Sequence, residues 1–94
     1  MEHFDIHWHH KVLTDPVRLV SEIDAERFEV RKLEFFVGGK VGHACSTSNT
    51  AGTLLGETPV PPFREITSDP QFTGKLITAQ EFEQLWATFV GQHT

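Results

Sequence analysis

The chain has 94 residues, which is the size of a single domain, and we expect one domain over residues 1–94. Acidic residues outnumber basic ones by 13 to 8, and the net charge of −5 argues against nucleic-acid binding, because phosphate contacts require a basic face. The start of the chain does not have the pattern of a signal peptide, and no apolar stretch reaches the roughly 20 residues that cross a bilayer. With one cysteine and therefore no intrachain disulfide, these features predict a soluble, cytoplasmic protein without a membrane partner.

Two strands are predicted near the N-terminus. Residues 3–10 alternate between apolar residues in one phase and mostly histidine or aspartate in the other, which is typical of a half-buried strand. A turn at residues 14–16 leads into a second apolar stretch, over residues 17–23, which we interpret as the second strand.

A long third strand is predicted over residues 27–37, with an irregularity inside it. Its apolar residues up to Val30 occupy one phase, and those from Leu33 onward occupy the other. Because a slip of one residue exchanges the faces of a strand, we expect a β-bulge near Arg31 and Lys32. The alternative is a strand that is buried on both sides at its far end.

Gly38 and Gly39 predict a tight hairpin, since two-residue turns require positive φ. A fourth strand over residues 40–46 follows. Residues 47–56 are rich in small polar side chains, and we expect them to form a mobile loop.

The last third of the chain predicts a short helical turn, a strand and a helix. Phe63 and Ile66, three residues apart, suit one helical turn, and residues 72–77 suit a short fifth strand. Thr78 and Glu81 have the spacing of a capping box, in which each side chain satisfies a free backbone donor of the first turn. An apolar stripe with helical spacing follows, made of Phe82, Leu85, Trp86 and Phe89.

This terminal helix must bury its stripe against one face of the sheet. The sequence therefore predicts an α+β fold, in which an antiparallel sheet of four to five strands is packed on one face by a C-terminal α-helix.

Histidines are concentrated in the first predicted strand. His3, His7 and His9 share the phase that we expect to face away from the helix, and residues two apart on a strand point the same way, about 6.5–7 Å apart. His7 and His9 could chelate zinc or another transition metal, with Asp5 as a third ligand, or His43 if the fourth strand lies alongside. A solvated sheet face without metal or cofactor is the interpretation we favour, because no second element supplies ligands at a defined spacing.

Cys45 follows His43 by two residues, so the two share a face of the fourth strand. A nucleophilic Cys–His pair needs an orienting third group, and no glycine-rich oxyanion loop accompanies these residues. A small buried thiol is the simpler interpretation. The sequence also lacks a phosphate-binding loop and a nucleophile elbow, so it favours a protein that is not an enzyme.

Charged residues are densest between Glu22 and Glu34. Acids and bases on paired strands mostly satisfy one another, so we interpret this stretch as surface ion pairs first and as a partner-recognition surface second. The contact residues that we expect, besides the loop over residues 47–56, are Glu22, Asp24, Arg27, Glu29 and Arg31.

Several motifs occur in the order of these elements: Trp8, Pro16-Val17, Ser21-Glu22-Ile23-Asp24, Glu29-Val30-Arg31-Lys32, Gly39, Leu55-Gly56, Glu81-Phe82-Glu83 and Trp86. Together they resemble a small uncharacterised bacterial domain family, over nearly the whole chain. The family is similar in size and genomic style to the stand-alone immunity proteins of bacterial toxin systems.

Three hypotheses about function follow. The first is a non-enzymatic protein-binding module, namely an immunity protein whose acidic surface speeds association with a basic bacterial toxin. The second is a metal- or small-molecule-binding protein that uses the histidine-rich first strand. The third is a homodimer that forms through an exposed edge or an open face of the sheet.

Overall fold

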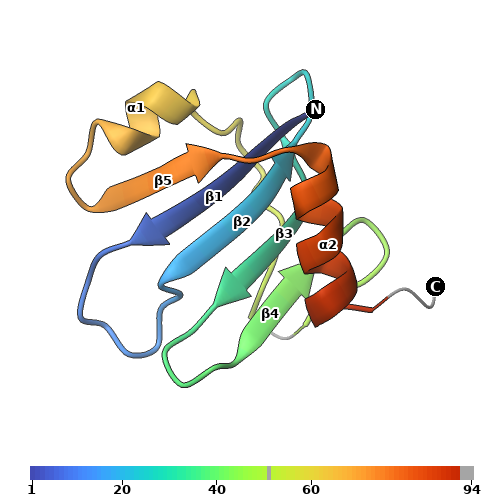
Figure 1. Ribbon diagram of the computed structural model, residues 1–94, viewed down its shortest axis with the longest axis horizontal. Helices are drawn as coiled ribbons and strands as arrows, with labels where there is room; N and C mark the ends of the chain where they lie inside the picture. The colour runs from blue at the N-terminus through green and yellow to red at the C-terminus, as the bar shows by residue number, and fades with distance from the viewer. Residues whose placement is uncertain (51, 92–94) are drawn as a thin grey trace.

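The computed structural model describes residues 1–50 and 52–91, and its main element is one antiparallel sheet of five strands in the order β4-β3-β2-β1-β5 (Figure 1). The strands are β1 (Glu2–Trp8), β2 (Arg18–Ile23), β3 (Glu29–Phe35), β4 (Val41–Ala44) and β5 (Phe72–Leu76). Helix α1 (Phe63–Thr67) precedes β5, and helix α2 (Ala79–Phe89) follows it. The predicted fold class, an antiparallel sheet with a C-terminal helix, is confirmed.

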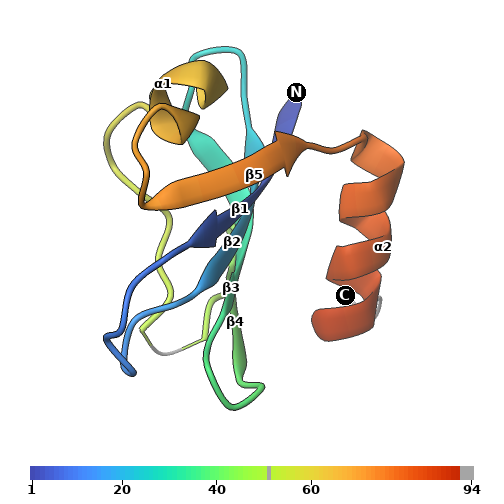
Figure 2. The ribbon, with the colours of Figure 1, turned by 60° about the vertical axis from the view of Figure 1, so that its left-hand side comes forward.

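The two helices lie on opposite faces of the sheet, which Figure 2 shows almost edge-on. Each face has its own hydrophobic core. On the α2 face, Val20 and Leu33 pack with Phe82 of the helix. On the α1 face, the buried cluster of Phe4, Ile6 and Ile23 packs against partly buried residues of α1 and its neighbours: Val60, Phe63, Ile66 and Phe72.

The apolar phase of β1 therefore faces α1, and its polar phase lies beneath α2. The expectation that the histidine phase faces solvent is wrong for His3, which is only 5% exposed, and Asp5 is buried as well. The reason lies outside β1. The chain returns after β4 and lays the apolar residues of segment 60–66 over Phe4 and Ile6.

A β-bulge in β3 sends two charged residues to opposite faces. Arg31 pairs with Glu22, whereas Glu29 pairs with the next residue of β2, so Val30 is the extra residue. The predicted bulge near Arg31 and Lys32 is confirmed, one position earlier. Residues two apart in a regular strand share a face, and the bulge breaks this rule: Arg31 lies against α2 and Glu29 lies on the α1 face.

The predicted hairpin and capping box are also present, although Phe36 pairs with Lys40, so the turn has three residues, 37–39, and not two. Gly38 and Gly39 have φ of 98° and 96° in the β3–β4 turn. At the start of α2, the Thr78 hydroxyl accepts from the Glu81 amide, and the Glu81 carboxylate accepts from the Thr78 amide at 3.0 Å. This backbone hydrogen bond, followed by one from the Thr78 hydroxyl, lowers the pKa of Glu81. Neither helix in the described part of the chain is long and apolar enough to cross a membrane.

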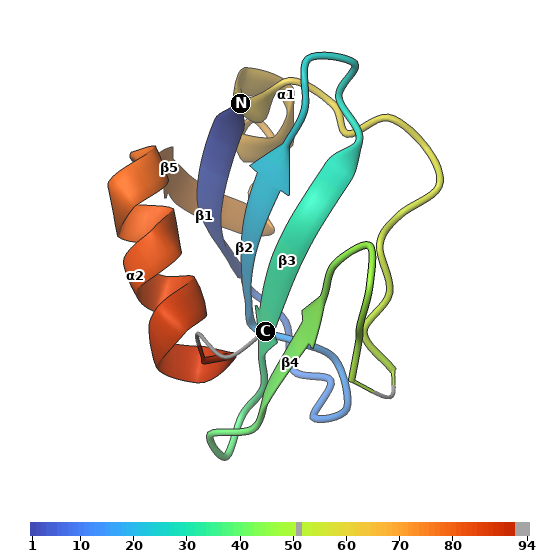
Figure 3. The same cartoon turned by 90° about the vertical axis from the view of Figure 1, so that its right-hand side faces the viewer.

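The connection between β4 and α1 passes the β4 edge before it reaches α1 (Figure 3). Thr53 is only 1% exposed, and its hydroxyl donates to the Glu34 carboxylate at 2.9 Å. The Thr50 amide donates to the carbonyl of His43 at 2.9 Å. The expected mobile loop over residues 47–56 is thus tied to β3 and β4 at these positions, and Ala51 lies outside the described residues.

Candidate functional site

Ionisable side chains gather between the sheet and α2 in a group that we name the α2 cluster: His3, Glu22, Arg31 and Glu83. Arg31 donates to the two oxygens of Glu22 at 2.7 and 3.0 Å, and it also binds Glu83 of α2. The His3 ring lies 3.0 Å from Glu22 on the other side. The Arg31 guanidinium covers the Phe82 ring, with its carbon 4.8 Å from the ring centroid.

The charges of the α2 cluster satisfy one another. The hydrogen bond from Arg31, and to a smaller extent that from His3, lowers the pKa of Glu22 although burial opposes the change. The pKa of Arg31 is raised, chiefly by its hydrogen bond with Glu22 and then by that with Glu83. Arg18 and Asp5 form a second pair beside it, at 2.8 and 2.9 Å. Arg31 and Glu83 join the helix to the sheet, whereas Arg18 and Asp5 join two strands, and each of these charged groups has a partner of opposite charge.

The structure does not bring the five residues predicted as contact residues together on one face of the sheet. Glu22 is 7% exposed, so it does not belong to an exposed surface, and Arg31 is its partner in the α2 cluster. Asp24 is used locally, because its carboxylate accepts from two amides of its own turn. Arg27 binds Glu2 and the backbone, and Glu29 lies on the other face of the sheet.

The structure does not bring the three predicted metal ligands together. His43 lies on β4, and β1 is separated from β4 by two strands, or about 14 Å at the usual strand spacing. His9 makes a hydrogen bond with Thr73 at 2.7 Å, while His7 is exposed. Among residues 1–50 and 52–91, no group of three or more His, Cys, Asp or Glu side chains is placed to hold a metal ion.

Cys45 lies just after β4 and is partly buried. Its sulfur is 3.5 Å from both the Ser48 and the Thr47 hydroxyls. Hydrogen bonds from Ser48 and then Thr47 lower the pKa of the Cys45 thiol to about 7. The His43 ring is 3.5 Å from the Ser48 hydroxyl, so in the structure it contacts the serine and not the sulfur.

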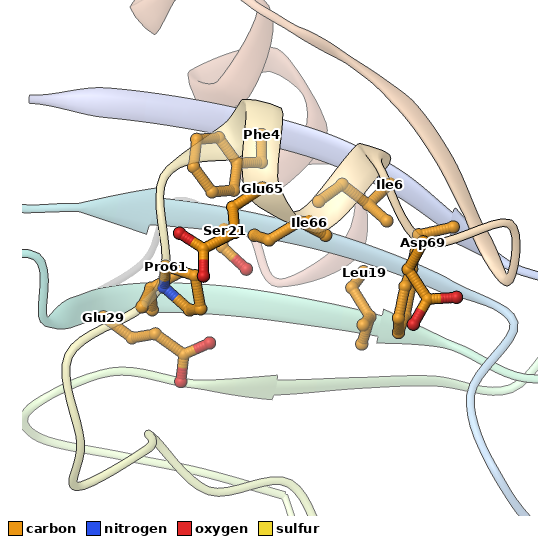
Figure 4. Close-up of a pocket in the computed structure, with 11 residues that line it drawn as sticks. Phe4, Ile6, Leu19, Ser21, Glu29, Pro61, Glu65, Ile66 and Asp69 are labelled. Atoms are coloured by element: carbon orange, nitrogen blue, oxygen red, sulfur yellow. The ribbon is translucent and has the colours of Figure 1, made fainter.

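An open groove on the α1 face is the strongest candidate for a ligand site (Figure 4). Its volume is about 410 Å³. Strands β1 and β2 form its floor, and α1 with the segment before it forms a wall. We name it the acidic groove, and its lining is Phe4, Ile6, Leu19, Ser21, Glu29, Val60, Pro61, Glu65, Ile66, Asp69 and Phe72.

Arg27 positions the wall of the groove. It has a φ of 75°, which turns the chain so that its guanidinium reaches the segment before α1. There it donates to the carbonyls of Val60 and Pro61 at 3.1 and 2.8 Å, and the Val60 amide donates back to the Arg27 carbonyl at 2.6 Å. Prolines at positions 59, 61 and 62 stiffen the same segment. The wall is therefore held in place by the β2–β3 turn.

Polar groups in the groove are only partly satisfied. Glu29 binds Lys32 at 3.2 Å and accepts from the Gly56 amide at 2.6 Å. Asp69 accepts from one backbone amide, and it makes no ion pair with any residue that the structure describes. Within the same described part of the chain, the Glu65 carboxylate and the Ser21 hydroxyl have no hydrogen-bond partner, although Ser21 is only 8% exposed. The groove thus combines an apolar floor with polar acceptors that are open to a ligand.

The chain matches, over residues 2–91, the model of a family described as "Domain of unknown function (DUF6881)". The chain belongs to this family. The predicted resemblance to an uncharacterised domain family is thereby confirmed. No curated protein and no solved structure matches the chain.

The acidic groove lies entirely within the DUF6881 match. Of its polar residues, sequence reasoning selected only Glu29. Ser21 stands in the Ser21-Glu22-Ile23-Asp24 motif, but that motif assigned it no role, and Glu65 belongs neither to a motif nor to the charge-dense stretch. One sequence feature could have indicated Glu65. It directly precedes Ile66, an apolar residue of the predicted helical turn, so it would be expected near the edge of the surface that the turn buries.

Proposed function

We propose that the protein is a non-enzymatic protein-binding module that recognises a basic partner through the acidic groove. The observation that carries the proposal is the pairing of an apolar floor with the carboxylates of Glu65 and Asp69, which no described cation neutralises. Carboxylates at an open apolar site attract a partner of opposite charge and fix its orientation. The net charge of −5 acts in the same direction at longer range.

The chemistry of the groove supports binding in preference to catalysis. Ser21 is the nearest candidate for a nucleophile, and a serine acts as one only with a base in hydrogen-bonding reach. No described side chain makes such a contact with Ser21, and the histidine of the α2 cluster lies on the opposite face of the sheet.

The partner that we propose is a basic bacterial toxin, which the protein inhibits by covering its active site. The role is that of the stand-alone immunity proteins that the family resembles. A fast association rate matters for such an inhibitor, because free toxin must be captured before it acts, and complementary charge raises this rate.

The direct test is co-expression with the product of the adjacent gene, followed by size-exclusion chromatography and a growth assay. We expect a stable complex and rescue of growth. The Glu65→Lys variant should weaken the complex at least tenfold, since it places a cation where the partner's cation binds. Absence of both complex and rescue would contradict the proposal.

A matched control is available on the other side of the molecule. Gln80 and Gln84 are exposed on α2, so a double change of both to lysine alters the net charge by the same amount as Glu65→Lys. We expect this control to bind the partner nearly as well as the original protein. Equal loss in both variants would show that the groove is not the interface.

A further inference from the structure

We infer that the acidic groove receives a single lysine or arginine side chain of the partner, with its hydrocarbon stem on the floor and its charged head between Ser21 and Glu65. The inference deepens the proposed function and rests on it, since it names the group by which the partner is recognised.

Ser21 is the first reason. Ser21 is only 8% exposed and lines the groove, and its hydroxyl has no partner among the described residues. Among those residues no side-chain oxygen or nitrogen is both fully buried and unpartnered, so this hydroxyl is open to the groove. A ligand that covers the groove removes water from this hydroxyl, and leaving it without a partner would then cost about 1–3 kcal/mol. A hydroxyl oxygen accepts readily from an N–H donor, so a donor on the ligand avoids that cost.

Glu65 is the second reason. It extends from α1 on the side of the groove where Ser21 lies, as Figure 4 shows, and no described cation pairs with it. Glu29 lies beyond Pro61 at the same end, where Lys32 already binds it, and Asp69 lies at the other end. An anionic ligand would be repelled here. A purely apolar side chain would strip water from Ser21 and Glu65 without replacing their hydrogen bonds.

The floor is the third reason, because it suits the stem of a long basic side chain. Lysine and arginine lay their methylene groups along apolar surface and keep the charged head at a polar border. Phe4, Ile6 and Leu19 form such a surface, and Ile66 faces it from α1. The volume of about 410 Å³ accommodates one such side chain together with part of the chain that carries it.

The test uses three capped tripeptides as probes: acetyl-Gly-Lys-Gly-amide, its arginine analogue, and its norleucine analogue, which has the stem of lysine without the charge. Each is titrated into the ¹⁵N-labelled protein at millimolar concentrations, and amide shifts are followed by NMR. We expect saturable shifts at Ser21, Glu65 and Ile66 with the lysine or the arginine peptide, and binding about tenfold weaker with norleucine, as the loss of a charge-assisted hydrogen bond implies.

Two variants locate the binding. Glu65→Gln and Ser21→Ala should each lower the affinity for the cationic peptide several-fold. Gln80→Lys changes the net charge by the same amount as Glu65→Gln, and it should leave this affinity unchanged. The NMR spectrum of each variant shows directly whether it is folded. Equal binding of norleucine, or no saturable shift with either cationic peptide, would overturn the inference.

The outcome also separates the inference from the proposed function. If a complex with the adjacent gene product forms and is weakened by Glu65→Lys, yet the cationic peptides do not bind, the proposed function stands and the inference fails. If the peptides bind in the groove but no complex with that partner forms, the choice of partner is wrong while the recognition chemistry holds.

Discussion

The two faces of the sheet both carry polar side chains, but these side chains have hydrogen-bond partners on one face and line an open groove on the other. Beneath α2, buried charges are paired: Glu22 accepts from Arg31 and contacts His3, and Arg31 also reaches Glu83 of the helix. On the α1 face, Ser21 is equally enclosed but has no hydrogen-bond partner among the described residues. The ionisable groups beneath α2 bind one another, whereas the Ser21 hydroxyl and the Glu65 carboxylate on the α1 face are open to a ligand.

The two faces therefore contribute differently to stability and to the proposed recognition of a partner. Helix α2 covers its face and adds a full hydrophobic core to the ion pairs. Helix α1 has only five residues and leaves the groove open beside it. Changes beneath α2 should therefore act on folding, whereas changes in the groove should act on binding.

The largest effect on stability is expected from Phe82→Ala. Phe82 is fully buried against Val20 and Leu33, so its loss should lower the free energy of unfolding by about 3–5 kcal/mol. Ile66→Ala, in the wall of the groove, should cost roughly 1–2 kcal/mol because the side chain is only partly buried. Urea unfolding followed by tryptophan fluorescence measures both. Similar losses would mean that the two faces contribute equally to stability.

A second experiment measures how the stability contributed by the α2 face depends on pH. Glu22→Gln should lower the free energy of unfolding by about 2–3 kcal/mol at pH 7, because it removes a buried charge that Arg31 binds. The pKa of Glu22 is lowered in the folded state, so its contribution is present above the unfolded pKa of about 4.3 and is lost as pH falls below it. The difference in the free energy of unfolding between the Glu22→Gln variant and the original protein should therefore shrink as the pH falls below that value.

Glu65→Gln provides the comparison, because it removes a carboxylate from the groove face. Its effect on stability should stay within about 0.5 kcal/mol at pH 7. A loss as large as that of Glu22→Gln would show that Glu65 has a structural partner, which would contradict the division between the two faces.

The smallest effect on the fold is expected at Cys45, which reports on the segment that follows β4. With a pKa of about 7, its thiol should react with iodoacetamide at a rate that rises around neutral pH. In Ser48→Ala the midpoint should move upward, because the hydroxyl that contributes most to the lowered pKa is gone. A midpoint near the ordinary thiol value of about 8.5 in the original protein would show that Ser48 and Thr47 do not hold the sulfur as described.

Most of the helices and strands could be predicted from local sequence patterns. Alternation, turn residues and capping pairs are local, and they indicated the strands, the Gly38-Gly39 hairpin, the β-bulge and the limits of α2 within a few residues. The fold class followed from them, since a helix with one apolar stripe must cover a sheet.

Which face of β1 each helix covers could not be predicted from local patterns, because it depends on contacts between distant parts of the chain. A period of two separates Phe4 and Ile6 from His3 and Asp5, but it does not say which set lies beneath α2. That choice depends on residues far along the chain: segment 60–66 covers the apolar set, and Arg31, turned by the bulge, completes a partner network for the polar set. The acidic groove exists because α1, whose single turn the sequence indicated, is too short to cover its face. That α1 lies over β1 and β2 at all follows from packing between distant segments.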